Sequence, residues 1–243
     1  MNTIRIDKKQ VGMIAHRGLS GIERENTYPA FVAAGNRSYF GIETDVHVTK
    51  DGKFVILHDK TTERVSLGTV NINVEENNYA TVSDVVLPDL DGCFQRQDIR
   101  IPLLADYIRI CKKYGKTCVL EVKNRFSEAD LARMVNEITD EGYLDSVIFI
   151  SFELDNCTDL RKLAPNNRIQ WLIGNKAVTE EIITTLVENS LDLDIHYKAL
   201  TPQTVALLHA KGIAVNCWTC DDKETAEHLV AMGVDFITTN ILE

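Results

Sequence analysis

The feature that most constrains the fold is a repeated alternation of short apolar runs with stretches of helical periodicity. Each apolar run has the length of a strand, and each is preceded or followed by a helical stretch. Eight such units within 243 residues favour a closed parallel barrel over an open doubly wound sheet. We therefore predict the α/β class and a (β/α)8 TIM barrel. The expected strands begin near residues 11, 41, 117, 147, 168, 191, 213 and 235.

The helical stretches between these strands carry recognisable start signals. Thr27 and Ser127 occupy expected N-caps, and Pro29 suits a first helical turn. Residues 60–103 lack regularity, are rich in Asn, Asp and Thr, and contain only one expected helical turn, over 82–87. Such a length is unusual for a loop in a compact domain, so we expect a small insertion or cover after strand two of a single domain spanning 1–243. The expected helices are 27–39, 104–114, 128–141, 155–163, 179–189, 202–211 and 222–232.

One stretch, GIETDVHVTKDGKFVILHD, combines strand periodicity with charged residues. Glu43 and Asp45 are two residues apart, so both project from the same strand face. Two such carboxylates repel each other and are costly to bury unless a metal cation lies between them. The Asp51-Gly52 pair predicts a tight turn, and the returning strand brings His58 back towards the carboxylates.

A second polar pair, Glu121 and Lys123, closes the third expected strand. An ion pair inside the barrel would explain this pair alone. Together with Glu43 and Asp45, however, Glu121 completes a set of three carboxylates, which suits Mg2+ or Ca2+ better than zinc. The carboxyl ends of adjacent barrel strands meet at one face, so we expect these groups to converge.

Two histidines, one arginine and one tryptophan also lie at strand ends. A lone histidine is usually structural, but His16 and His58 both face the expected carboxylates, which favours an acid–base pair. Arg17 offers a planar fork for a phosphate oxygen, although a surface ion pair is its ordinary fate. Trp218 suits either an apolar ligand wall or core packing.

Composition argues against several classes of function. The net charge of −10 and the pI near 5.1 argue against binding to nucleic acid or anionic membranes, since those surfaces require excess Lys and Arg. No segment resembles a signal peptide or a membrane span, so we expect a cytoplasmic protein with no stable membrane association. The six scattered cysteines indicate reduced thiols, and Cys217 and Cys220 lack the second pair of a zinc knuckle. The sequence is compatible with a homo-oligomer, but it identifies no surface as the subunit interface.

Several short motifs together resemble the glycerophosphodiester phosphodiesterase family. They follow the order of the family and span nearly the whole chain, and HRG, ExD, HD and ExK form a specific set. The matching pieces are AHRG from Ala15, ENT from Glu25 with AF at Ala30, IETDVHVTKDGKFVILHD from Ile42, IPLL from Ile101, LEVK from Leu120, SF at Ser151, WT at Trp218 and GVDFITTN from Gly233.

The resemblance implies a metal-dependent hydrolase that cleaves a small-molecule glycerophosphodiester to glycerol 3-phosphate and an alcohol, in lipid and glycerol metabolism. It implies His16 and His58 as general acid and base. Glu25 would be a further metal ligand or an orienting group. The remaining implied roles are Glu43, Asp45 and Glu121 as ligands of Mg2+ or Ca2+, Arg17 and Lys123 as phosphate-binding residues, and Trp218 as a substrate wall.

Two departures from the family pattern fall in the expected loops over the site. Arg24 stands where the family commonly has proline, and the run 60–66 differs from the family's usual Leu and Arg-Thr-Thr pattern. Neither removes an expected catalytic group, but both bear on the leaving-group preference.

Two alternative functions also fit a barrel of this kind. The first is a phospholipid headgroup lyase or phospholipase D-like enzyme, against which the absence of a signal peptide and an apolar anchor weighs. The second is a catalytically silent phosphodiester-binding protein, against which the complete set of carboxylates and histidines weighs.

Overall fold

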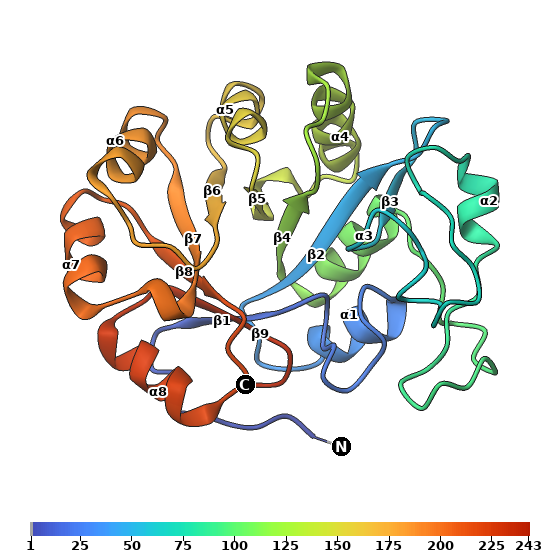
Figure 1. The fold of residues 1–243 in the computed structure, drawn as a ribbon, viewed down its shortest axis with the longest axis horizontal. Coiled ribbons are helices and arrows are strands. Elements are labelled where there is room, and N and C mark those ends of the chain that lie inside the picture. Colours follow the sequence, from blue (N-terminus) through green and yellow to red (C-terminus); the bar gives the residue numbers. More distant parts are fainter. Residues whose placement is uncertain (1) are drawn as a thin grey trace.

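The computed structural model describes residues 2–243, which form a sheet of nine strands with helices around its outside (Figure 1). Short runs of apolar residues buried on both faces form most of these strands, as expected of a parallel sheet. The strands are β1 (Gly12–Ala15), β2 (Gly41–Val48), β3 (Phe54–Ile56), β4 (Thr117–Val122), β5 (Val147–Ser151), β6 (Arg168–Ile173), β7 (Asp192–His196), β8 (Val215–Trp218) and β9 (Phe236–Thr239).

The sheet closes into a barrel. Its strand order is β1-β9-β8-β7-β6-β5-β4-β2-β3, and a further parallel pairing joins β1 to β2 with Ile14 opposite Gly41. The strand β3 pairs antiparallel with β2, which makes the predicted hairpin. Within the described residues, the other eight strands are parallel, so the predicted (β/α)8 TIM barrel is confirmed.

Most helices agree with the expected ranges to within a few residues, but the helix expected over 27–39 ends at Gly35, and two local expectations were not met. Thr27 occupies an N-cap, but its hydroxyl donates to the Arg24 carbonyl (2.5 Å) and does not cap the helix. The turn expected over 82–87 is wrong, because the short helix ends at Ser83. The helices are α1 (Tyr28–Gly35), α2 (Tyr79–Ser83), α3 (Leu104–Tyr114), α4 (Glu128–Asp140), α5 (Leu154–Leu163), α6 (Glu180–Glu188), α7 (Pro202–Ala210) and α8 (Lys223–Met232).

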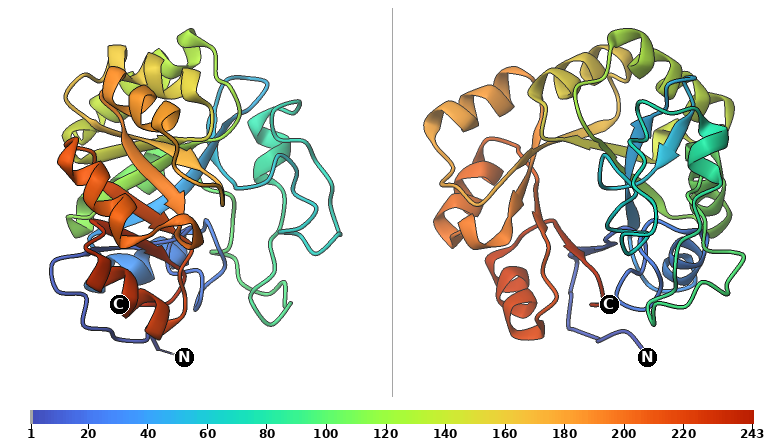
Figure 2. Two further views of the ribbon diagram at one scale, coloured as in Figure 1. Left: turned by 60° about the vertical axis from the view of Figure 1, so that its left-hand side comes forward. Right: turned by 45° about the vertical axis from the view of Figure 1, so that its right-hand side comes forward.

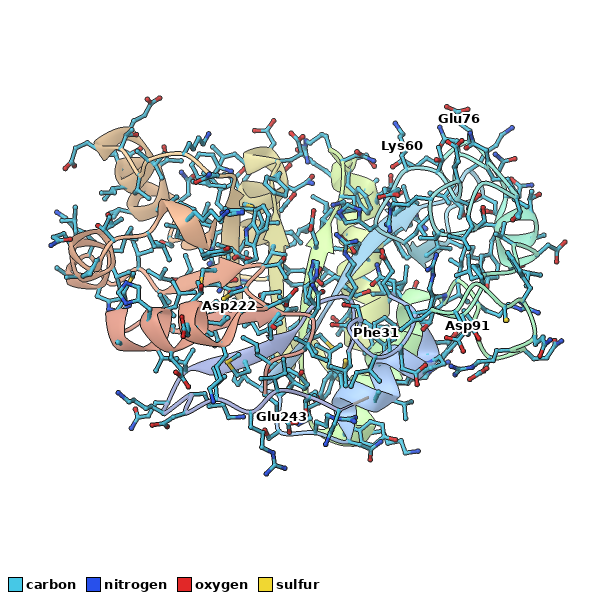
Figure 3. All side chains as sticks on the ribbon, turned by 60° about the horizontal axis from the view of Figure 1, so that its bottom comes forward. Phe31, Lys60, Glu76, Asp91, Asp222 and Glu243 are labelled. Atoms are coloured by element: carbon cyan, nitrogen blue, oxygen red, sulfur yellow. The ribbon has the colours of Figure 1, made fainter. Side chains whose placement is uncertain are left out.

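Residues 60–103 form the predicted insertion after the second barrel strand. They stand to one side of the barrel in Figure 2, and Lys60, Glu76 and Asp91 mark them in Figure 3. Their apolar side chains, among them Val65 and Val74, pack with residues of the hairpin in a small cluster separate from the main core. Tertiary packing and turns therefore hold this segment, in place of regular periodicity.

The barrel interior changes character along its axis. Ile14, Val119 and Ile148 belong to an apolar inner cluster, whereas acidic and basic side chains gather at the carboxyl ends of the strands. That end carries the active site in barrels of this type. Among residues 2–243, no helix has both the length and the apolarity needed to cross a bilayer.

Candidate functional site

Three carboxylates from adjacent strands meet at the carboxyl end of the barrel. Glu43 and Asp45 lie on β2 and Glu121 on β4, with Asp45 in register with Glu121. All three are buried, and one oxygen from each lies within 4.8 Å of the others. The structure thus brings together the three residues that the sequence predicted as metal ligands.

The electrostatics of this cluster fit a divalent cation. Burial raises the pKa of Glu43 well above its usual range, and the charges of Asp45 and Glu121 add to the rise. Burial and the charge of Asp45 raise the pKa of Glu121 to about 7. Asp45 Oδ1 is buried without a hydrogen-bond partner in the described part of the chain. A cation bound here would relieve the repulsion and coordinate this oxygen, and an all-carboxylate donor set suits Mg2+ or Ca2+.

Two basic side chains flank the cluster. Lys123 Nζ lies 2.6 Å from Glu121 Oε1 and 3.4 Å from Asp45 Oδ1. The Arg17 backbone N–H donates to Glu43 Oε2 (2.7 Å), and its Nε lies 3.6 Å from Asp45 Oδ2. Arg17 has a φ of 53°, a left-handed conformation uncommon for residues other than glycine. Burial opposes the charge of Asp45, but Lys123 and Arg17 outweigh it and hold its pKa below the usual range.

The ring of His16 is oriented by the far end of the chain. Its Nδ1 lies 2.8 Å from Asn240 Oδ1, while Asn240 Nδ2 donates to Asp221 (2.6 Å). Because Asp221 selects the orientation of this amide, Asn240 Oδ1 is an acceptor and His16 Nδ1 carries the proton. His16 Nε2 then faces the cluster, 4.0 Å from Glu43 Oε2. Burial and the charge of Arg17 lower the pKa of His16 to about 4.

A chain of charged side chains orients His58. Its Nδ1 lies 2.6 Å from Asp59 Oδ1, and Arg64 Nε donates to Asp59 Oδ2 (2.5 Å). Arg64 also donates twice to Glu25 (2.8 Å each), and Glu25 accepts from Arg17 (2.9 Å). Burial disfavours the charged form of Glu25. Hydrogen bonds from Arg64 and Arg17, together with their positive charges, outweigh this effect and lower the pKa of Glu25 to about 2. Glu25 thus lies between two arginines rather than in the carboxylate cluster.

His47 shares the inner face of β2 but does not reach the carboxylate cluster. Its Nδ1 lies 3.0 Å from Glu75 Oε1, and its Nε2 lies 3.2 Å from the His58 backbone carbonyl. Glu75 belongs to the segment 60–103 and also contacts Lys60 (3.3 Å). His47 therefore connects the insertion to the backbone of His58.

Part of this charged cluster borders a cavity of about 100 Å3. His16, Arg17 and Glu121 line one part of it, and Ile150, Leu172 and Trp218 line another. Trp218 contacts Phe152 edge-on at a centroid distance of 5.8 Å. The cavity thus offers a polar and an apolar wall, as ligand sites commonly do.

The model of the glycerophosphoryl diester phosphodiesterase family matches residues 16–243. The chain belongs to this family. It is therefore a phosphodiesterase, and the match includes every candidate site residue described above.

Relatives and solved structures agree with this assignment. A glycerophosphodiester phosphodiesterase of Caldanaerobacter subterraneus subsp. tengcongensis is 28% identical over 232 residues, covering 94% of this chain and 93% of the relative. The crystal structure of a glycerophosphodiester phosphodiesterase from Parabacteroides distasonis has a TM-score of 0.77 at 26% identity, covering 95% of this chain and 93% of that chain. An Oleispira antarctica phosphodiesterase, solved with the product sn-glycerol-3-phosphate, shares the fold (TM-score 0.82, 22% identity, coverage 98% and 96%).

Several polar residues of this phosphodiesterase site were not singled out from the sequence. Asn26 Nδ2 donates to Asp45 Oδ2 (2.8 Å), while its Oδ1 accepts from Thr44 Oγ1 (2.7 Å). Its φ of 56° is tolerated by asparagine, and its place in the ENT motif was the available signal. Asn240 had the GVDFITTN motif as a signal, but no local pattern relates it to His16, which is 224 positions away.

Proposed function

We propose that this phosphodiesterase hydrolyses glycerophosphodiesters to glycerol 3-phosphate and an alcohol, in a reaction that depends on Mg2+ or Ca2+. The observation that carries the proposal is the convergence of three buried carboxylates with two basic side chains, beside a cavity that both histidines also line. A phosphodiester is a monoanion, so the guanidinium of Arg17 and the ammonium of Lys123 complement its charge.

Glu43, Asp45 and Glu121 would hold the metal cation. When bound, such a cation polarises a phosphate oxygen and lowers the pKa of a coordinated hydroxyl. Arg17 and Lys123 then orient the phosphate and balance the negative charge that grows on it. Trp218 packs against the carbon skeleton of the substrate as an apolar wall.

His16 and His58 exchange the protons of the reaction. One imidazole accepts the proton of the attacking oxygen, and the other donates a proton to the departing alkoxide. This role is supported by the anchoring of both Nδ1 atoms, on Asn240 and on Asp59, which leaves both Nε2 atoms for the reacting groups. The carboxylate of Asp59 stabilises the imidazolium form of His58.

The proposal extends to the organisation of the chain. Residues 1–243 act as one catalytic domain, with the segment 60–103 as a cover beside the site. Support comes from Arg64, which lies in this segment and donates hydrogen bonds to both Asp59 and Glu25.

The test is direct release of product. Purified protein is incubated with glycerophosphocholine, glycerophosphoethanolamine or glycerophosphoglycerol, in Mg2+, Ca2+ or EDTA, and glycerol 3-phosphate is assayed. We expect release that requires a cation and falls by about 10²–10⁴ in His16→Ala and His58→Ala. Absence of release with every substrate and cation, or full activity of both variants, would refute the proposal.

A further inference from the structure

The cavity contains a buried carboxyl group that the proposed chemistry does not use. Asp194 lies on β7, and its flanking residues Leu193 and Ile195 pack into the outer core, so its side chain projects into the barrel. It lines the cavity and is 1% exposed. Among the described residues, Asp194 Oδ1 has no hydrogen-bond partner.

The position of Asp194 separates it from the carboxylate cluster. In the closed strand order, β7 is reached from β2 through β1, β9 and β8, or through β4, β5 and β6. Asp194 therefore lies across the barrel from Glu43 and Asp45. Leu172 is its register neighbour on β6, and Asn216 is its neighbour on β8. The side chain of Leu172 is apolar. Asn216 donates a hydrogen bond to Gln170 (3.1 Å) and accepts one from Thr238 (3.3 Å).

A second unpartnered polar atom lines the same cavity. Trp218 lies on β8 two residues beyond Asn216, so its side chain shares the inner face with that of Asp194 on the adjacent strand. In the described part of the chain, its indole Nε1 is buried and has no acceptor. The Trp218 N–H and Asp194 Oδ1 thus both lack a hydrogen-bond partner. Burying such a group without a partner costs folding free energy, and a ligand that forms a hydrogen bond to it recovers part of that cost.

The geometry points to a hydroxyl subsite, formed by Asp194 and Trp218, that binds the terminal hydroxyl of the glycerol moiety. An alcohol both donates and accepts, so it satisfies a carboxyl oxygen and an indole N–H together. The inference rests on the proposed function, in which the phosphate lies across the barrel beside Arg17 and Lys123. The part of the cavity near Asp194 and Trp218 is small, and it suits the polyol end of the diester.

The environment of Asp194 favours its neutral form. Burial raises the pKa of Asp194 well above its usual range, and the charge of Glu121 adds to the rise. An uncharged carboxyl group and a carboxamide have similar shapes and both donate and accept hydrogen bonds. Asp194→Asn is therefore the conservative variant, whereas Asp194→Leu removes every hydrogen bond at this position.

The experiment compares two substrates that differ by one hydroxyl. Glycerophosphocholine is set against 2-hydroxypropyl phosphocholine, which lacks the terminal hydroxyl but keeps the one beside it. We expect the unmodified protein to prefer glycerophosphocholine by about 10- to 100-fold in kcat/KM, the usual effect of one unpaired buried polar group. Asp194→Leu should reduce this preference to within about threefold, and Asp194→Asn should retain most of it.

The outcomes separate this inference from the proposed function. If the unmodified protein does not cleave glycerophosphocholine, the proposed function fails. If it does, and Asp194→Leu keeps its full preference for glycerophosphocholine, the hydroxyl subsite is refuted. Trp218→Phe keeps an aromatic ring and removes the N–H, so it should lower the preference several-fold. This variant provides the test if Asp194→Leu does not fold. An unchanged preference in Trp218→Phe would refute the subsite.

Thermal unfolding tests a purely structural role for Asp194. If a buried water satisfied this carboxyl group, Asp194→Leu would lower the melting temperature and leave the substrate preference unchanged, which would overturn the inference. We expect an equal or higher melting temperature instead. The leucine removes an unpaired polar group and adds apolar contact with Leu172.

Discussion

Replacing Asp59 by asparagine should slow the enzyme while leaving its fold intact. The carboxylate of Asp59 holds His58 Nδ1 at 2.6 Å and Arg64 Nε at 2.5 Å. The asparagine keeps the shape but removes the charge that stabilises a protonated His58. It also allows the amide to present an N–H where the carboxylate presented an acceptor.

The magnitude follows from the strength and exposure of this contact. A hydrogen bond to a charged group is worth about 1.5–3 kcal/mol, and solvent weakens it. The side chains of His58 and Asp59 are 32% and 28% exposed, so the lower part of that range applies. About 1.5–2 kcal/mol corresponds to a roughly 10- to 30-fold loss in kcat/KM.

The assay is kcat/KM for glycerophosphocholine as a function of pH. Burial lowers the pKa of His58 and the bond from Asp59 raises it, so Asp59→Asn should lower this pKa further. The limb of the pH profile that reports His58 should therefore move to lower pH. Asp7→Asn is the matched control at an exposed aspartate. A profile and a rate equal to those of the control would refute the role assigned to Asp59.

Three further perturbations test the cluster, the arginine pair and the loop after β1. Mg2+ or Ca2+ at a hundredfold excess over Kd should raise the free energy of unfolding by about 2.7 kcal/mol, seen as a higher melting temperature that EDTA reverses. Glu43→Gln should abolish this response, and an equal response in that variant would contradict the metal site. Glu25 has a pKa lowered to about 2, so its charge should contribute about 3 kcal/mol to the free energy of unfolding above pH 4.5, lost as pH falls towards 2. Denaturant unfolding of Glu25→Gln at pH 7 and pH 3 measures this, and a pH-independent difference from the parent would argue against it. Gly18→Ala should cost about 2 kcal/mol or more, because φ is +74° and the new Cβ would lie 2.7 Å from the Ala30 carbonyl carbon. Gly68→Ala is its control, with a φ of +78° and, in the described structure, open space around the Cβ; equal losses would refute the steric argument.

Local patterns in the sequence determined the elements of the barrel. The expected helix over 104–114 agrees with α3, whose C-cap residue Gly115 has a φ of 62°, the left-handed conformation that glycine favours. Ser127 caps α4 by accepting from the Asp130 N–H (3.1 Å), as predicted. The grouping of Glu43, Asp45 and Glu121 was also predictable, because strand alternation and the order of barrel strands involve only spacing and topology.

Irregular packing explains why the secondary structure of the segment 60–103 was predicted less well from the sequence. Val82, Val85 and Leu87 suggested a helical turn, but Val85 and Leu87 lie beyond the end of α2 at Ser83. Their burial comes from contact with a separate apolar cluster, so their spacing reflects tertiary contacts rather than a helical period.

The partners of the polar side chains were decided only by the closed barrel. The sequence placed His16 just past the first strand and Asp194 within the strand expected from residue 191. It did not indicate that Asn240 orients His16 or that Asp194 Oδ1 has no partner within residues 2–243. Periodicity depends on neighbours a few residues apart, and it therefore assigns a side chain to a face. Hydrogen-bond partners depend on which strands and loops meet when the barrel closes, and such contacts join residues as far apart as His16 and Asn240, which are separated by 224 positions.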